Sequence, residues 1–189
     1  NRGKYLIICT VLVFFTGVPG SRWSGIAQRI KQDPIYNSTD RAPHRIYRHG
    51  EFSGHCDSYF GTGMEFDTSL DYSNLIAPFE NTSGTLLLMS HEWPYMFDEI
   101  IERYPYADIQ LVYRPNDASL SWWLEAGGFD ITYPNYEWYV DVEGMRKEIA
   151  QQNKLILDFA QQHMLQWKQD EKHSDIFLAT YRNTELHES

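Results

Sequence analysis

The chain has 189 residues, a length that fits a single domain with a sizeable hydrophobic core. Its net charge of −10 argues against a broad electrostatic surface for nucleic acid, so no nucleic-acid partner is expected. The two cysteines, Cys9 and Cys56, form neither a disulfide framework nor a metal-binding pair, which favours a reducing, cytoplasmic environment. An anionic ligand would have to be held by local arginines and main-chain amides.

An almost unbroken apolar run covers residues 5–18 near the start of the chain. It is shorter than the ~18–20 residues that a bilayer span requires, so no membrane span is expected. The run leads directly into a glycine-rich turn, and a cleaved signal segment could not serve as the strand beneath that turn. We therefore expect a buried strand over residues 10–16, with residues 1–9 as its extension or as an irregular arm.

The rest of the chain alternates between strand and helix signals, apart from a loop-rich region over residues 37–81. Further strands are expected over the short apolar runs at residues 84–90, 108–113 and 175–182. Helices are expected where apolar residues recur at helical spacing, over residues 24–31, 94–104, 117–126 and 141–169, the last as one helix or two. This alternation predicts an α/β domain spanning residues 1–189, with a mostly parallel central sheet and helices on both faces.

The stretch TGVPGSRWSGIAQ, residues 16–28, follows the first predicted strand and opens the first predicted helix. Its glycines allow close approach of the main chain, and N–H groups at a helix start favour an anion. Ser21 and Ser24 add hydroxyl donors, while Arg22 adds a forked cation suited to oxyanions. The Gly-Lys-Ser/Thr of a nucleotide triphosphatase is missing. Taken alone, the stretch fits a structural turn as well as it fits an anion site.

Two further motifs follow predicted strands. LVYRPNDASLSWW, residues 111–123, places Arg114 at a strand end, where it would face the same crevice as the glycine-rich turn. The alternative reading makes Asp117 a helix cap and Arg114 its surface partner. LLLMSHEWPYMF, residues 86–97, places His91 at the end of another strand as a candidate general base, with Glu92 as its rival.

In their order along the chain, with the His91 motif between the other two, the three motifs resemble those of the sulfotransferases that use 3′-phosphoadenosine 5′-phosphosulfate (PAPS). TGVPGSRWS looks like a variant of the loop T-Y-P-K-S-G-T-T-W, which holds the 5′-phosphosulfate in that family. RPNDASLS resembles the segment Arg-x-Pro-x-Asp-x-x-x-Ser, which holds the 3′-phosphate, with one residue missing. His91 matches the catalytic base of a strand-end Lys-x-His. The chain departs from the family at Gly20 and Met89, which replace two basic residues, and it has no clear match to a later Arg-Lys-Gly clamp.

The resemblance implies a P-loop NTPase-like three-layer fold and transfer of a sulfuryl group from PAPS to a hydroxyl or amine of a small-molecule or glycan acceptor, without a metal. His91 would be the general base, and Arg22 would replace the missing loop cation. The implied donor-binding residues are Gly20, Ser21, Arg22, Trp23, Ser24, Arg114, Ser119 and Ser121.

The acceptor wall is expected around His55, Tyr59 and Phe60, because this region supplies acceptor contacts in that family. The histidines of this region and Cys56 follow no familiar zinc spacing, so no metal site is expected there. Two other functions compete with the sulfotransferase. One is a P-loop kinase, and the other is a non-catalytic nucleotide-binding protein of the same fold.

Overall fold

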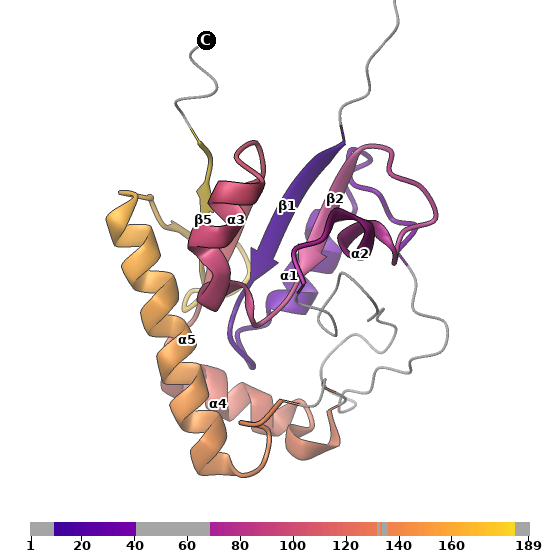
Figure 1. Ribbon diagram of the computed structural model, residues 1–189. Helices are drawn as coiled ribbons and strands as arrows, with labels where there is room; N and C mark the ends of the chain where they lie inside the picture. Colours follow the sequence, from indigo (N-terminus) through magenta and orange to yellow (C-terminus); the bar gives the residue numbers. More distant parts are fainter. Residues whose placement is uncertain (1–9, 41–68, 132, 134–135, 184–189) are drawn as a thin grey trace, which may run out of the picture.

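The computed structural model describes residues 10–40, 69–131, 133 and 136–183. Within these residues the strands form one five-stranded sheet in the order β2-β1-β3-β5-β4 (Figure 1). The strands are β1 (Val11–Thr16), β2 (Thr85–Met89), β3 (Asp108–Tyr113), β4 (Lys168–Gln169) and β5 (Phe177–Tyr181). The α-helices are α1 (Trp23–Ile30), α2 (Tyr72–Ile76), α3 (Phe97–Arg103), α4 (Asn116–Glu125) and α5 (Val142–Gln162), and the 3₁₀ turns are η2 (Trp93–Met96) and η3 (Gly128–Asp130). The α/β class predicted from the sequence is confirmed.

The sheet is mixed rather than uniformly parallel. β1 lies next to the edge strand β2 and pairs in parallel with β2 on one side and with the central strand β3 on the other. β5 runs antiparallel to both β3 and β4. The carboxyl ends of β1, β2 and β3 therefore meet at one edge of the sheet, which is where ligands bind in open α/β sheets. Because β5 is reversed, the turn between β4 and β5 lies at this same edge.

Helices cover both faces of the sheet, as the side chains of β1 show. Successive strand residues point to opposite faces, and Phe14 and Phe15 are both fully buried. The ring of Phe14 packs edge-on against Trp93 of η2, with centroids 5.2 Å apart. The ring of Phe15 stacks on Trp23 of α1 at 6.0 Å. The segment formed by η2 and α3 thus lies on one side of the sheet and α1 on the other (Figure 1).

The long amphipathic segment forms one helix that is shorter than expected. α5 begins after Asp141, whose side chain accepts a hydrogen bond from the Gly144 amide at 2.7 Å, and it ends at Gln162 rather than near residue 169. Met164 adopts a left-handed φ of 52°, which cannot continue an α-helix. The chain then turns back, and Trp167 packs against Tyr113 of β3. Tertiary contact therefore overrides the helical periodicity beyond residue 162.

Two segments singled out in the sequence lie outside the described residues. They are residues 1–9 and the expected acceptor wall around His55, Tyr59 and Phe60. α2 falls within the region expected to be loop-rich.

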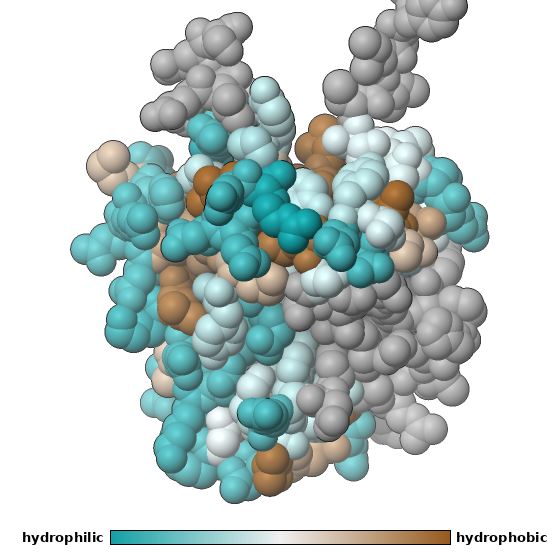
Figure 2. All heavy atoms as spheres, in the orientation of Figure 1, coloured by the Kyte–Doolittle hydropathy of each residue, from teal (hydrophilic) through white to brown (hydrophobic). Residues whose placement is uncertain are grey.

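On the face shown in Figure 2, the described residues are mostly hydrophilic, with apolar ones in small scattered groups. None of the helices in the described ranges is long and apolar enough to cross a membrane.

Candidate functional site

The loop between β1 and α1 has an unusual backbone. Gly20 has a φ of 82°, and Arg22 has a φ of 61° at the N-cap of α1. A left-handed conformation costs a non-glycine residue about 1 kcal/mol, and such strain is concentrated at functional sites. The N-cap side chain makes no capping hydrogen bond, and the first turn of α1 contains no acidic residue. No side chain at the start of α1 therefore neutralises the positive end of the helix dipole.

The loop packs directly on α4 and is held there by Arg114. A Cβ atom at Gly20 would lie only 1.7 Å from the carbonyl oxygen of Ser119, so the two backbones touch. The guanidinium of Arg114 donates from Nη1 to the Gly20 carbonyl at 3.1 Å and from Nε to Asp175 at 2.9 Å. The hydroxyl of Ser119 donates to the Arg114 carbonyl at 3.1 Å. Arg114 and Ser119 therefore hold the protein's own backbone and side chains together.

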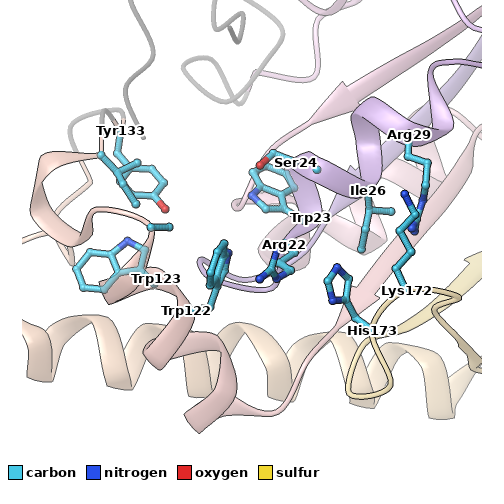
Figure 3. A pocket seen from close by; sticks show the side chains of 14 residues that line it. Arg22, Trp23, Ser24, Ile26, Arg29, Trp122, Trp123, Tyr133, Lys172 and His173 are labelled. Atoms are coloured by element: carbon cyan, nitrogen blue, oxygen red, sulfur yellow. The ribbon is translucent and has the colours of Figure 1, made fainter. Parts of the chain in front are cut away.

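A cavity of about 210 Å³ lies beside this loop, between α1, α4 and the β4–β5 turn. Its two ends differ in chemistry (Figure 3). We define the cationic end by the side chains that carry or can carry positive charge: Arg22, Arg29, Lys172 and His173. We define the aromatic end by the rings at the other side: Trp23, Trp122, Trp123 and Tyr133.

Arg22 joins the two ends of the cavity. Its guanidinium lies over the ring of Trp122, 3.5 Å from the ring centroid, which is a close cation–π contact. Burial lowers the pKa of Arg22, and the nearby positive charge of Arg114 lowers it further. A bound anion would relieve both effects, because it would neutralise a cation that has lost part of its hydration.

Asp170 shapes the turn that supplies the other cations. Its carboxylate is bonded to Arg29 of α1 and accepts from the amides of Lys172 and His173, each at 3.1 Å. Burial alone would raise the pKa of Asp170, but the bonds from Arg29 and the turn amides lower it. The pKa of His173 is lowered by burial and then by the charge of Arg22. His173 is therefore mostly neutral at pH 7, while Lys172 and the arginines carry the charge.

The structure brings together part of the donor-binding set expected from the sequence. Of that set, the residues lining the cavity are Gly20, Arg22, Trp23 and Ser24. Ser21 is fully buried, and Ser121 is exposed on α4. The side chains of Arg114 and Ser119 make the hydrogen bonds within the protein that are described above. None of Ser21, Arg114, Ser119 and Ser121 lines the cavity, and their predicted ligand contacts remain predictions.

Sequence reasoning missed the residues that complete the cavity. Arg29 belongs to the predicted first helix, but its position facing the site depends on the turn that Asp170 shapes. Lys172 and His173 reach the site because β5 runs antiparallel to β3, and the sequence did not predict the direction of this last strand. The signal that could have found them is the basic pair in a short polar segment between two apolar runs, directly before the last strand.

His91 lies behind the cavity wall rather than in it. The imidazole is fully buried, with its ring centroid 4.1 Å from that of Trp23 and 5.7 Å from that of Tyr133. Its Nδ1 is 2.6 Å from the carbonyl oxygen of Gly17. A carbonyl can only accept, so Nδ1 carries the proton and Nε2 is the basic nitrogen. Burial lowers the pKa of His91 to about 3, against the opposing effect of the Gly17 bond, so the ring is neutral at physiological pH.

Glu92, the rival base, is half-buried beside His91 in the chain. Its pKa is raised by burial, an effect that the bond from Trp138 opposes and the charge of Glu148 reinforces. The indole N–H of Trp138 donates to its Oε1 at 3.5 Å. Neither Glu92 nor His91 lines the cavity. The assignment of the general base therefore stays a prediction.

Across the described ranges, no three or more His, Cys, Asp or Glu residues gather in a way that could hold a metal ion. Comparisons with protein-family models, with curated proteins and with solved structures find no match for this chain. The resemblance to the sulfotransferases therefore rests on the sequence motifs alone.

The close contact of Gly20 with α4 gives a test of the loop conformation. We expect Gly20→Ala to lower the free energy of unfolding by at least about 3 kcal/mol, because its Cβ would meet the Ser119 carbonyl at a left-handed φ. Gly25→Ala is the matched control in the same helix start, since a Cβ there meets nothing within 4 Å. It should stabilise the protein by about 0.5–1 kcal/mol. Equal effects of the two variants in urea denaturation would refute this loop geometry.

The burial of His91 predicts a specific pH dependence of stability. The pKa of His91 falls from 6.5 in the unfolded chain to about 3 in the folded one. Between these values only the unfolded chain binds the proton, so the contribution of His91 is complete above pH 6.5 and is lost as the pH falls towards 3. The slope is at most about 1.4 kcal/mol per pH unit.

The variant His91→Asn keeps an N–H for the Gly17 carbonyl but cannot be protonated. Its free energy of unfolding, measured by urea denaturation across this pH window, should fall less steeply with decreasing pH than that of the wild type. Parallel pH profiles for the two proteins would show that His91 is not buried in its neutral form.

Proposed function

We propose that the chain is a PAPS-dependent sulfotransferase with a P-loop-type α/β fold. One observation carries this proposal. Basic side chains from α1 and from the β4–β5 turn converge with an uncapped helix start on one cavity, in a chain whose net charge is −10. Such a site suits a ligand with more than one anionic group. The loop lacks the Lys-Ser/Thr pair that binds a magnesium triphosphate, which disfavours a kinase.

The two ends of the donor would be held from opposite sides of the cavity. The main-chain N–H groups at the start of α1 would bind the 5′-phosphosulfate, with Arg22 supplying the cation that Gly20 does not. Lys172 and His173, across the cavity, would bind the second phosphate. This arrangement replaces the expected role of Arg114, because its guanidinium is already bonded to Asp175 and Gly20.

In the proposed reaction, an acceptor hydroxyl or amine attacks the sulfur atom of the donor. The bond from sulfur to the bridging phosphate oxygen breaks, and that oxygen leaves with the electron pair. The acceptor proton passes to a general base, for which Nε2 of His91 is our candidate. As in phosphoryl transfer, positioning and charge stabilisation would supply most of the acceleration, and the scheme requires no metal ion.

A second candidate function is nucleotide binding without transfer. The position of His91 favours it, since the ring is fully buried, does not line the cavity and has a pKa of about 3. A base with so low a pKa has little driving force to accept a proton. The two candidates share the same ligand site and differ only in the chemical step.

Ligand binding separates these candidates from a kinase. We expect adenosine 3′,5′-bisphosphate to raise the melting temperature and to bind in calorimetry, because it presents two phosphates to the cationic end. Arg22→Gly removes the guanidinium, and glycine can keep the left-handed conformation of residue 22. Lys172→Ala removes the ammonium group on the other side of the cavity. Each should weaken binding about tenfold, the loss of one charge-assisted hydrogen bond.

The matched control is Arg146→Ala, which removes an exposed arginine paired with Glu143 on α5, outside the cavity lining. It should bind as the wild type does. Stabilisation by ATP with Mg²⁺ but not by the bisphosphate would overturn the sulfotransferase proposal.

Sulfuryl transfer separates the enzyme from the binding protein. The wild type, given PAPS and a panel of hydroxyl and amine acceptors, should add one sulfuryl group to at least one of them, as seen by mass spectrometry. His91→Asn should bind the bisphosphate normally and lose turnover, whereas Glu92→Gln should retain it. The opposite pattern would assign the base to Glu92, and binding without transfer to any acceptor would favour the non-catalytic candidate.

A further inference from the structure

The aromatic end of the cavity contains a buried donor that the proposed phosphate contacts do not use. Trp123 of α4 is only 1% exposed and lines the cavity. Its indole N–H is buried and has no hydrogen-bond partner in the part of the chain that the structure describes. A buried indole N–H usually finds a partner. Trp93, which is equally buried, follows this rule and donates to the Leu88 carbonyl at 3.0 Å.

The surroundings of Trp123 define the shape of a ligand that could accept this hydrogen bond. Phe129 packs edge-on against its ring at 5.0 Å and helps to fix the indole in place. In Figure 3 the nitrogen of Trp123 lies on the side of the indole that faces Tyr133, across the hollow from Trp23. The rings around this hollow suit a flat apolar group. The free donor suits a group with an acceptor atom on its edge.

The aromatic end is also directly connected to the cationic end. Trp122 lies between Trp123 and Arg22 in Figure 3, and its ring is covered by the Arg22 guanidinium. A ligand that fills both ends must therefore carry its flat ring close to an anionic group. At about 210 Å³, the cavity is smaller than the roughly 300–1,000 Å³ of pockets that enclose drug-sized ligands, which favours a ring and its nearest phosphate over a larger enclosed group.

We infer that the aromatic end binds the purine base of a nucleotide, and that a ring nitrogen of the base accepts a hydrogen bond from the Trp123 indole N–H. This inference rests on the proposed function and names the base subsite of its donor. Trp123 is thereby a specificity-determining residue. A base without an acceptor at the facing position leaves the buried donor unpaired, and this is how a buried polar group discriminates between ligands.

The test compares adenosine 3′,5′-bisphosphate with analogues in which one ring nitrogen of adenine is replaced by C–H, namely the 1-deaza, 3-deaza and 7-deaza compounds. In wild-type protein, one analogue should bind about tenfold more weakly than the parent in calorimetry, a typical cost of leaving a buried donor unpaired. Trp123→Phe keeps an aromatic ring and removes the donor, so it should bind the parent and that analogue equally.

Trp167→Phe is the matched control, because Trp167 packs on Tyr113 and does not line the cavity. It should keep the wild-type preference. Equal binding of all four compounds by the wild type, or a preference that survives in Trp123→Phe, overturns the base subsite while leaving the proposed function intact. Failure of the parent bisphosphate to bind overturns both.

If Trp123→Phe does not fold, the indole N–H resonances in NMR spectra of the wild-type protein provide a direct test. Only one indole N–H resonance should move downfield when the parent bisphosphate binds, and it should not do so with the analogue that binds more weakly. A spectrum in which no indole N–H resonance moves downfield would overturn the inference.

Discussion

The arrangement of the cavity walls depends on the partly buried Arg114, whose side chain makes hydrogen bonds to other parts of the protein. The side chain of Arg114 donates to the Gly20 carbonyl and to Asp175, so it joins the β1–α1 loop to the β4–β5 turn. Its own carbonyl accepts hydrogen bonds from Ser119 of α4 and from Asn153 of α5, the latter at 2.8 Å. These bonds fix, relative to the end of β3, the elements that form the cavity walls. A strand-end arginine that looks like a ligand contact in the sequence is thus first a structural contact.

The charges of the cavity stand out against the acidic chain that surrounds them. A net charge of −10 gives no general attraction for anions, so the proposed anion binding would have to come from a small enclosed set of cations. Burial makes a cation here costly without a ligand, and the lowered pKa of Arg22 reflects this cost. The Trp122 ring and the Asp170 carboxylate offset part of this cost while holding the cations in place. Such preorganisation favours tight binding of an anion.

Local patterns predicted β1, β2, β3 and β5 well because each lies in a short apolar run, whereas β4 (Lys168–Gln169) falls within the stretch that was expected to be helical. The third strand was predicted over residues 108–113, where β3 lies. Four of the loop residues singled out in the sequence line the cavity because the loop and the helix start are continuous in sequence: Gly20, Arg22, Trp23 and Ser24. Lys172 and His173 were not predicted, since their position depends on the antiparallel pairing of β5 with β3. The burial of His91 was also invisible in sequence, because Trp23, Tyr133 and Trp138 enclose it from distant segments.

The central claim is that the cavity between α1, α4 and the β4–β5 turn binds the phosphates of a nucleotide. A crystal structure of the complex with adenosine 3′,5′-bisphosphate tests it most directly. We predict one phosphate against the main-chain amides at the start of α1 beside Arg22, and the other within hydrogen-bond distance of Lys172, with Arg114 still bonded to Asp175. A nucleotide bound away from this cavity, or one that contacts neither Arg22 nor Lys172, would contradict the account.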